Sequence, residues 1–233
     1  MKKANVIQHI LFEGIGNIEI ALLQRGFTIF NYYAPTDDLS NVSDCDLLII
    51  LGAPVSVNDD KIYPYLMEEK QILKQRVLND LPTIGICLGA QLLAEVTGSK
   101  IYSGDVKEIG WHEIYSNENT ILSHFNNEMA FHWHGDTFDA NDKMEVIAKS
   151  KLYIQAFIIG KNILGLQFHP EYQGGNEIEK WLIGHACELN TNKIDVFKMR
   201  TDNMLYSDWY QSLSSKLWAQ YLDNINLGLR TVH

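Results

Sequence analysis

The segment PTIGICLGAQLLA, residues 82–94, is the part of the sequence from which the fold can be inferred most directly. Its apolar, largely β-branched residues 83–86 lead into a Gly-Ile-Cys-Leu-Gly corner, and a run of good helix formers follows at once. This order is typical of a nucleophile elbow, in which a strand turns sharply into a helix and holds one side chain exposed at the corner. The glycines fit because they tolerate positive φ and close backbone approach. The segment therefore predicts a strand, a helix and a nucleophile, Cys87, between them.

Cys87 is placed for acyl transfer at the first turn of the predicted helix. The unpaired N–H groups and the dipole of a helix N-terminus favour a thiolate over a thiol. The same groups can stabilise an oxyanion, so the backbone N–H of Leu88 is one expected donor. A small-residue turn after the preceding strand, Gly-Ala-Pro at 52–54, can supply a second donor from Ala53. Gln91 lies one helical turn after Cys87 on the same face, where its amide can bind a polar group of the substrate.

A thiol nucleophile needs a base, and His169 is the best candidate among eight histidines. It ends the apolar run 164–168, and Pro170 blocks continuation of that strand. Glu171, two residues on, is placed to bond the far imidazole nitrogen and fix the tautomer. The alternative is a histidine bonded only to its own loop. With the elbow, the pattern favours a base and its orienting carboxylate.

A second pair of histidines, His132 and His134, alternates along a predicted strand, so both side chains face one side. Such a pair can bind a metal, but no third ligand follows at a familiar spacing. We therefore expect no metal site and interpret His134, Gly135 and Asp136 as a substrate-contacting loop. The remaining histidines have no partner pattern and are assigned to structural or surface positions: His9, His112, His124, His185 and His233.

The composition is that of an ordinary globular protein with excess negative charge. The 233 residues include 29 acidic and 19 basic side chains, giving a net charge of −10, and no run is rich in lysine and arginine. Nucleic-acid and membrane partners are therefore not expected. No apolar stretch approaches the length of a membrane span. Three widely separated cysteines without a C-x-x-C pair fit a reducing cytoplasm better than a disulfide scaffold.

The alternation of segments before Gly98 predicts an α/β fold. Strand-like runs alternate with helical ones, and the continuous apolar run 46–51 is typical of a strand buried in a parallel sheet. We expect a mostly parallel, twisted sheet with helices on both faces. The expected strands are 5–12, 27–33, 46–51 and 83–86, and the expected helices are 15–25, 62–78 and the elbow helix.

The chain after Gly98 predicts an added antiparallel section and then a helical tail. Strands are expected at 100–116 and 128–138, and a hairpin turns at 161–162 between two further strands. Helices are expected at 177–189, 195–202 and 206–225, the last with an aromatic stripe typical of a docked core face. Without repeats or linkers, we expect one domain over 1–233, with a motif-bearing core at about 5–175 and an extension at about 176–233.

Four motifs together resemble the class I (triad) glutamine amidotransferases, most closely the stand-alone branch similar to the amidotransferase domain of GMP synthase. They occur in the family's order over about residues 5–175 and imply its flavodoxin-like fold. They are Gly-Ala-Pro at 52–54, Gly-Ile-Cys-Leu-Gly-Ala-Gln at 85–91, His-Gly-Asp at 134–136 and Gln-Phe-His-Pro-Glu at 167–171.

The resemblance implies a Cys87–His169–Glu171 triad that removes the side-chain amide of glutamine through a γ-glutamyl thioester, with no cofactor. It also implies oxyanion donors at the backbone of Ala53 and Leu88. The implied substrate-binding residues are Gly52, Gln91, His134, Gly135 and Asp136. One departure concerns Ala53, because the family usually has Gly-Gly-Pro there. A Cβ at this position can restrict a flip of the oxyanion loop.

Three functions remain open from the sequence. The first is a glutaminase that passes ammonia to a separate synthetase partner, since no G-x-x-x-x-G-K-S/T phosphate loop is present. The second is an autonomous γ-glutamyl hydrolase or peptidase that uses the same thioester. The third is a binding or regulatory protein with a vestigial triad. The aromatic stripe of the tail can cover the core or a second copy of the chain, so a homo-oligomer also stays open.

Overall fold

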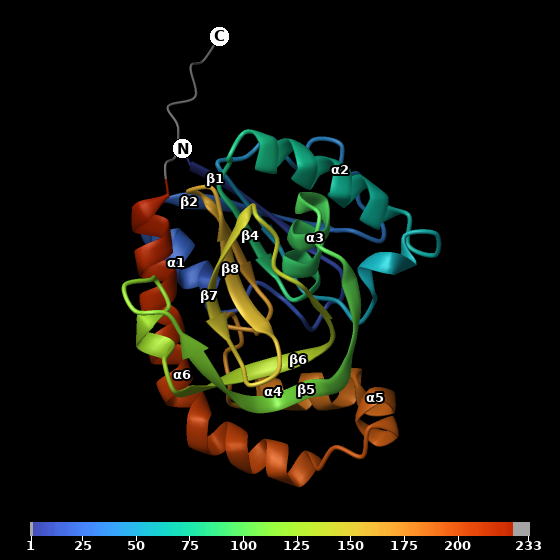
Figure 1. Ribbon diagram of the computed structural model, residues 1–233, viewed down its shortest axis with the longest axis vertical. Coiled ribbons are helices and arrows are strands. Elements are labelled where there is room, and N and C mark those ends of the chain that lie inside the picture. Colours follow the sequence, from blue (N-terminus) through green and yellow to red (C-terminus); the bar gives the residue numbers. More distant parts are fainter. Residues whose placement is uncertain (1, 226–233) are drawn as a thin grey trace.

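The structure is a computed structural model that describes residues 2–225 (Figure 1). Nine strands form one sheet in the order β2-β1-β3-β4-β9-β8-β7-β5-β6. The strands are β1 (Lys2–Gln8), β2 (Phe27–Tyr33), β3 (Leu47–Ile50), β4 (Thr83–Ile86), β5 (Ile101–Ser116), β6 (Glu128–Phe138), β7 (Met144–Lys149), β8 (Ile154–Ile159) and β9 (Ile163–Leu166).

The sheet has a parallel half and an antiparallel half. β2, β1, β3, β4 and β9 pair in parallel, and β9, β8, β7, β5 and β6 pair in antiparallel fashion. Parallel neighbours need crossover connections, and helices supply them between β1 and β2 and between β3 and β4. The predicted α/β fold with an added antiparallel section is confirmed.

Helices cover both faces of the parallel half (Figure 1). One face packs against α1 (Ile18–Gln24) and α6 (Val196–Asn224), the other against α2 (Tyr65–Leu78) and α3 (Leu88–Thr97). The residues of β3 alternate between the two cores, with Leu47 and Ile49 on the first face and Leu48 and Ile50 on the second. A strand buried on both sides has no polar face, which explains its continuous apolar sequence.

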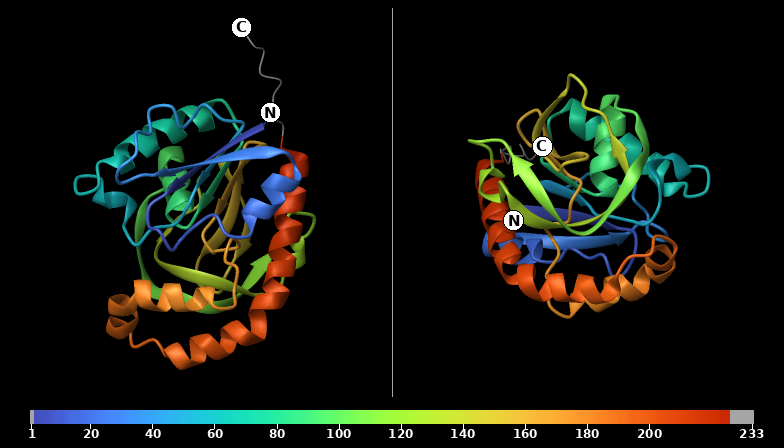
Figure 2. Two further views of the ribbon diagram at one scale, coloured as in Figure 1. Left: turned by 180° about the vertical axis from the view of Figure 1, so that it is seen from behind. Right: turned by 60° about the horizontal axis from the view of Figure 1, so that its bottom comes forward.

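The tail forms an arc around one side of the molecule. α4 (Glu177–Gly184), α5 (Ala186–Thr191) and α6 follow one another in space, as the two views of Figure 2 show. α6 continues alongside α1, where Arg25 forms an ion pair with Asp223 at 2.8 Å. The tail therefore packs on the sheet that carries the motifs.

Two predictions about the tail helices were wrong. The segment 177–189 breaks at His185, whose φ of −107° and ψ of 20° are not helical, so α4 ends at Gly184 and α5 begins at Ala186. Gly184 packs against Phe12, and a Cβ there would come within 2.3 Å of its ring. Conversely, the helices expected at 195–202 and 206–225 are the single helix α6. Asn203 does not interrupt it, because this buried side chain accepts a hydrogen bond from the hydroxyl of Tyr172 at 2.7 Å. The N-terminal helix is also shorter than expected and begins at Ile18.

Candidate active site

Four neighbouring parallel strands deliver the central residues of the site. His9, Gly52, Cys87 and His169 come just after β1, β3, β4 and β9, which are adjacent in the sheet. Ligands of open α/β sheets bind at the carboxyl ends of the strands, and these four residues lie there. The backbone holds the corner in place, since the N–H of Cys87 donates to Leu166 O at 2.8 Å. The structure thus brings the elbow and the predicted base together.

Cys87 occupies a strained corner between β4 and α3. Its φ of 50° and ψ of −103° lie outside the regions that ordinary residues adopt, and such backbone costs of order 1–3 kcal/mol. Gly85 and Gly89 are needed for close approach. A Cβ on Gly85 would lie 2.4 Å from Gly89 O, and one on Gly89 would lie 2.3 Å from Ile50 O. The corner therefore matches the predicted nucleophile elbow in geometry.

His169 is bonded to Glu171, as the spacing predicts. Nδ1 of His169 lies 2.6 Å from Oε1 of Glu171, and both side chains are buried. The turn that carries them is anchored by Asn17, whose backbone N–H donates to Glu171 O and whose side chain donates to Pro170 O, each at 3.0 Å. The imidazole is therefore fixed with Nε2 as its second, reactive nitrogen.

Burial and two carboxylates act on Cys87 against the expected effect of the helix N-terminus. Burial raises the pKa of the Cys87 thiol, the neighbouring His169 lowers it in part, and Glu13 and Glu171 raise it further. That the helix N-terminus favours a thiolate stays a prediction. The Sγ–H donates to Trp133 O at 3.6 Å. Burial disfavours the imidazolium of His169, but the Glu171 carboxylate and the contact with Cys87 outweigh it and raise the His169 pKa well above its ordinary value. The surroundings therefore stabilise the imidazolium that forms when His169 takes up a proton.

Two backbone N–H groups lie where oxyanion donors were expected. Leu88 is the first residue of α3, so its N–H has no acceptor within the helix. Ala53 lines the same cavity as Cys87. Gly52 beside it accommodates no side chain, because a Cβ there would lie 2.5 Å from Oε2 of Glu13 and 3.1 Å from His169.

A cavity of about 540 Å³ opens above Cys87. Its walls come from the β3–α2 loop, the β5–β6 hairpin, α3 and the start of the tail. The lining residues are Glu13, Ala53, Pro54, Val55, Ser56, Cys87, Gln91, Ser103, Lys107, Trp133, His134, Gly135, Asp136, Gly184, His185, Cys187, Glu188, Thr191 and Asn192. The volume falls within the range of small-molecule sites.

One end of the cavity contains the predicted substrate residues Gln91, Gly135 and Asp136. The amide nitrogen of Gln91 donates to Asp136 O and to Gln167 Oε1, each at 3.2 Å. The carboxylate of Asp136 accepts a hydrogen bond from the hydroxyl of Ser56 at 2.7 Å. These contacts hold a carboxylate and an amide together at the cavity wall.

The comparison with known proteins agrees with this geometry. A family model described as glutamine amidotransferase class-I matches residues 15–187. The chain belongs to this family. The amidotransferase is 28% identical to the glutamine amidotransferase-like protein YfeJ of Salmonella typhimurium, covering 97% of this chain and 98% of that protein. It is 32% identical over 155 residues to the GMP synthase (glutamine-hydrolysing) of Brachyspira hyodysenteriae, covering 62% of this chain and 29% of that protein.

The fold is also similar to solved structures of glutamine amidotransferases. A glutamine amidotransferase from Thermotoga maritima superposes with a TM-score of 0.86 at 27% identity, covering 95% of this chain and 98% of that one. The enzyme class and the resemblance to the GMP synthase branch, both predicted from the four motifs, are confirmed.

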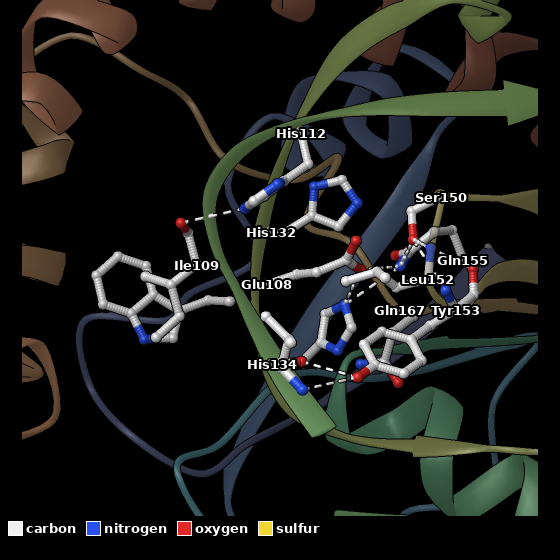
Figure 3. A network of polar contacts seen from close by, with 12 residues as sticks. Glu108, Ile109, His112, His132, His134, Ser150, Leu152, Tyr153, Gln155 and Gln167 are labelled. Carbon is white, nitrogen blue, oxygen red and sulfur yellow. Dashed lines mark hydrogen bonds and ion pairs between the residues drawn. The ribbon is translucent and has the colours of Figure 1, made fainter. Parts of the chain in front are cut away.

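His134 of the amidotransferase lines the cavity but lies within β6, whereas a loop was expected there. Its ring is buried, with Nδ1 at 3.3 Å from Asp136 O and Nε2 at 3.2 Å from Oε2 of Glu108 (Figure 3). Gln155 donates to the same Glu108 oxygen at 2.7 Å. Burial would raise the pKa of Glu108, but its contact with His134 dominates and lowers it to about 2. Both ring nitrogens of His134 thus contact the protein, so its geometry suits support of Gly135 and Asp136.

The neighbouring His132 faces the same side as His134, as the alternation predicts. The ring centroids lie 5.9 Å apart, and burial lowers the pKa of His132 to about 3. Among the described residues, no group of three or more His, Cys, Asp or Glu side chains is arranged to hold a metal ion.

Sequence reasoning missed the opposite wall of the cavity. Glu13 is 4% exposed, and its Oε1 lies 3.2 Å from Nε2 of His185. Nδ1 of His185 lies 3.7 Å from Glu188, which also accepts from the indole N–H of Trp133 at 3.0 Å. His185 was assigned to a structural or surface position, but it lines the cavity. The sequence contains only a weak indication of this wall, because Glu13 is a lone acidic residue in the loop that follows β1.

His9 was also assigned no partner, and it contacts both Gly52 and Glu69. The last unassigned histidine, His233, lies outside the described residues. No helix within the described part of the chain is long and apolar enough to cross a membrane.

Proposed function

We propose that this amidotransferase hydrolyses the side-chain amide of glutamine through a γ-glutamyl thioester on Cys87. The observation that carries the proposal is that the strained Cys87 corner, which lines the cavity, lies beside the bonded His169–Glu171 pair. A Cβ built on Gly52 would lie 3.1 Å from Cε1 of His169 and 3.4 Å from Cβ of Cys87, so the two side chains flank the same point. In this arrangement a nucleophile, a base and an orienting carboxylate have the relation of a catalytic triad.

The reaction follows from the positions of these groups. Nε2 of His169 accepts the thiol proton as Sγ attacks the amide carbon of glutamine. The N–H groups of Ala53 and Leu88 stabilise the oxyanion of the tetrahedral intermediate. The C–N bond then breaks, and the imidazolium gives its proton to the leaving ammonia. Water, activated by the same imidazole, hydrolyses the thioester to glutamate and restores the thiol.

The amino-acid head of the substrate is proposed to bind at Gln91 and Asp136. The Asp136 carboxylate and the amide oxygen of Gln91 are both acceptors and suit an α-ammonium group, because the two hydrogens of the Gln91 amide are donated within the protein. The backbone of Gly135 suits the α-carboxylate region. The backbone of Gly52 lies against the reacting end, where no side chain fits. His134 supports this end through Asp136 O.

The fate of the ammonia is proposed from the relatives. The chain matches 29% of a GMP synthase whose name records glutamine hydrolysis. We propose that ammonia passes to a separate synthetase partner, and that the protein works in a reducing cytoplasm, where its free cysteines stay reduced.

Ammonia release from glutamine tests the proposed reaction. We expect turnover by the wild-type protein, none by Cys87→Ser, and a loss of several orders of magnitude in His169→Ala. Wild-type rates in His169→Ala would reject the triad. If the wild-type protein releases no ammonia from glutamine and Cys87 is not labelled by a glutamine-mimicking alkylator, a binding or regulatory function would be favoured.

A second candidate, hydrolysis of larger γ-glutamyl amides, is favoured by the size of the cavity. Even at the roughly 30 Å³ per heavy atom of liquid water, the ten heavy atoms of glutamine need about 300 Å³, whereas the cavity has about 540 Å³. The extra space is lined by Glu13, His185 and Glu188. Carboxylates there suit an amine portion that carries a distant positive charge.

Substrate preference separates the two candidates. We propose comparing kcat/KM for glutamine, γ-glutamyl-ethylamide and γ-glutamyl-putrescine. The second candidate requires preference for the putrescine amide, reduced at least tenfold in Glu13→Gln. Glu179→Gln is a matched control, because it removes the same charge from the tail outside the cavity. Preference for glutamine would support the first candidate function, hydrolysis of glutamine with transfer of its ammonia.

A further inference from the structure

The peptide that joins Gly52 to Ala53 is held by a buried histidine. Nδ1 of His9 lies 3.2 Å from Gly52 O, and Nε2 lies 3.0 Å from Oε1 of Glu69 on α2. His9 is 5% exposed and Glu69 is fully buried. The contact therefore joins α2 to the loop that follows β3, behind the reaction centre.

The two contacts define the protonation of His9. A carbonyl oxygen can only accept, so Nδ1 carries a hydrogen, and the Glu69 carboxylate requires one on Nε2 as well. Burial alone would lower the pKa of His9, but the charge of Glu69 and the hydrogen bonds to Glu69 and Gly52 outweigh it and raise the pKa above 6.5. Glu13 acts in the same direction, and the ring of Tyr65 lies 5.8 Å away. The contact with Gly52 O thus requires a hydrogen on Nδ1 of His9, and its surroundings favour the protonated ring.

The geometry of the peptide bond links this contact to the oxyanion site. No cis peptide occurs among residues 2–225, and in a trans peptide the C=O and N–H point in opposite directions. Because His9 holds Gly52 O on its own side, the N–H of Ala53 points away from His9. Ala53 lines the cavity of Cys87, and no acceptor for its N–H is found among the described residues.

We propose that His9, oriented by Glu69, is a positioning residue that fixes the 52–53 peptide with the Ala53 N–H set as an oxyanion donor. The proposal rests on the proposed thioester reaction. It also explains why the protein tolerates Ala53 where the family usually has glycine. The Cβ of Ala53 hinders rotation of the 52–53 peptide, but no rotation is needed if the peptide is already held in the donor orientation. The protein would then need no partner to arrange its oxyanion site.

Two substitutions at His9 separate donation from packing. His9→Phe keeps a ring of similar size without a donor, whereas Nδ2 of His9→Asn can take the place of Nδ1. With glutamine, we expect His9→Phe to lower kcat at least tenfold, up to the roughly 10²–10³-fold that loss of one oxyanion donor costs, with KM unchanged. His9→Asn should recover most of the lost kcat.

Ligand binding distinguishes a preset donor from a general structural effect. γ-Glutamyl semialdehyde forms a tetrahedral thiohemiacetal with Cys87 and requires the oxyanion site, whereas glutamine bound to a Cys87→Ser protein does not. We expect His9→Phe to weaken the aldehyde at least tenfold and to leave glutamine affinity in the Cys87→Ser background unchanged.

Three results would overturn the proposal while leaving the thioester reaction intact: wild-type kcat in His9→Phe, equal losses in His9→Phe and His9→Asn, or parallel weakening of both ligands. If the wild-type protein turns over no γ-glutamyl amide and binds no aldehyde, the proposed function itself fails.

Discussion

At the scale of single residues, the proposed reaction depends on where the proton of Cys87 rests. Burial raises the pKa of this thiol, and Glu171 raises the pKa of His169. In the proposed reaction a neutral His169 takes the thiol proton, and Glu171 stabilises the imidazolium that results. The Sγ–H contact to Trp133 O must break for this transfer.

Replacing Glu171 with glutamine tests the origin of that basicity. Glu171→Gln removes the charge that raises the pKa of His169, so the imidazole should titrate at lower pH than in the wild type. We expect kcat/KM to fall by about 10²-fold or more, the scale of general acid–base contributions. NMR titration of His169 gives the direction, and an unchanged titration would contradict the assignment.

His9 and Glu69 should also contribute a pH-dependent part of stability. Because the folded-state pKa of His9 is raised, its stabilisation is fully present below the unfolded value of about 6.5 and is lost as pH rises through the folded value. Urea unfolding of the wild type and Glu69→Gln should show a stability difference that shrinks as pH rises. A difference that grows with pH would exclude an imidazolium at position 9.

At the scale of elements, α6 supports the turn that carries His169. The indole N–H of Trp218 donates to Oδ1 of Asn17 at 2.6 Å, and Asn17 in turn donates to Pro170 O and Glu171 O. Trp218 is fully buried. Asn17 therefore connects α6 to the turn of His169 through hydrogen bonds.

Two tryptophans of α6 provide a matched test of this connection. Trp218→Phe leaves Asn17 Oδ1 unpaired, which should cost about 1–3 kcal/mol in the free energy of unfolding and lower kcat. Trp209 is 53% exposed and donates to Glu128 at the surface, so Trp209→Phe should stay within about 0.5 kcal/mol. Urea unfolding and glutamine turnover check both, and equal effects would contradict the role of Trp218.

Local patterns explain which elements could be predicted. The elbow and the His169 turn have short-range signatures, because strand, corner and helix or strand, proline and carboxylate follow one another in sequence. The break at His185 has no such signature, and neither has the packing of the adjacent Gly184 against Phe12, which is far away in the sequence. Asn203 is polar in sequence but satisfied by Tyr172, so α6 continues where a break was expected.

At the scale of the whole molecule, the site is assembled from parts that are far apart in the chain. Glu13 and His185, which share one hydrogen bond, are separated by 172 positions, and no periodicity connects them. The position of His9 likewise depends on its contact with Glu69, which lies on another element, α2. The proximity of Cys87, His169 and Glu171 could be predicted because their motifs are specific, whereas the cavity walls required the fold.

The arrangement also favours one domain. The sheet is continuous from β2 to β6, and the tail packs on its α1 face. We propose that the motif-bearing core and the tail fold together, with the tail completing the cavity through His185 and Glu188.

The most direct test of the central claim is covalent labelling of Cys87 by 6-diazo-5-oxo-norleucine, which mimics glutamine, followed by intact-mass measurement. We expect one adduct in the wild type and in Cys187→Ser, which removes the exposed cysteine, protection of both by glutamine, and no adduct in Cys87→Ser. An unlabelled wild type, or an adduct that persists in Cys87→Ser, would contradict a γ-glutamyl thioester at this residue.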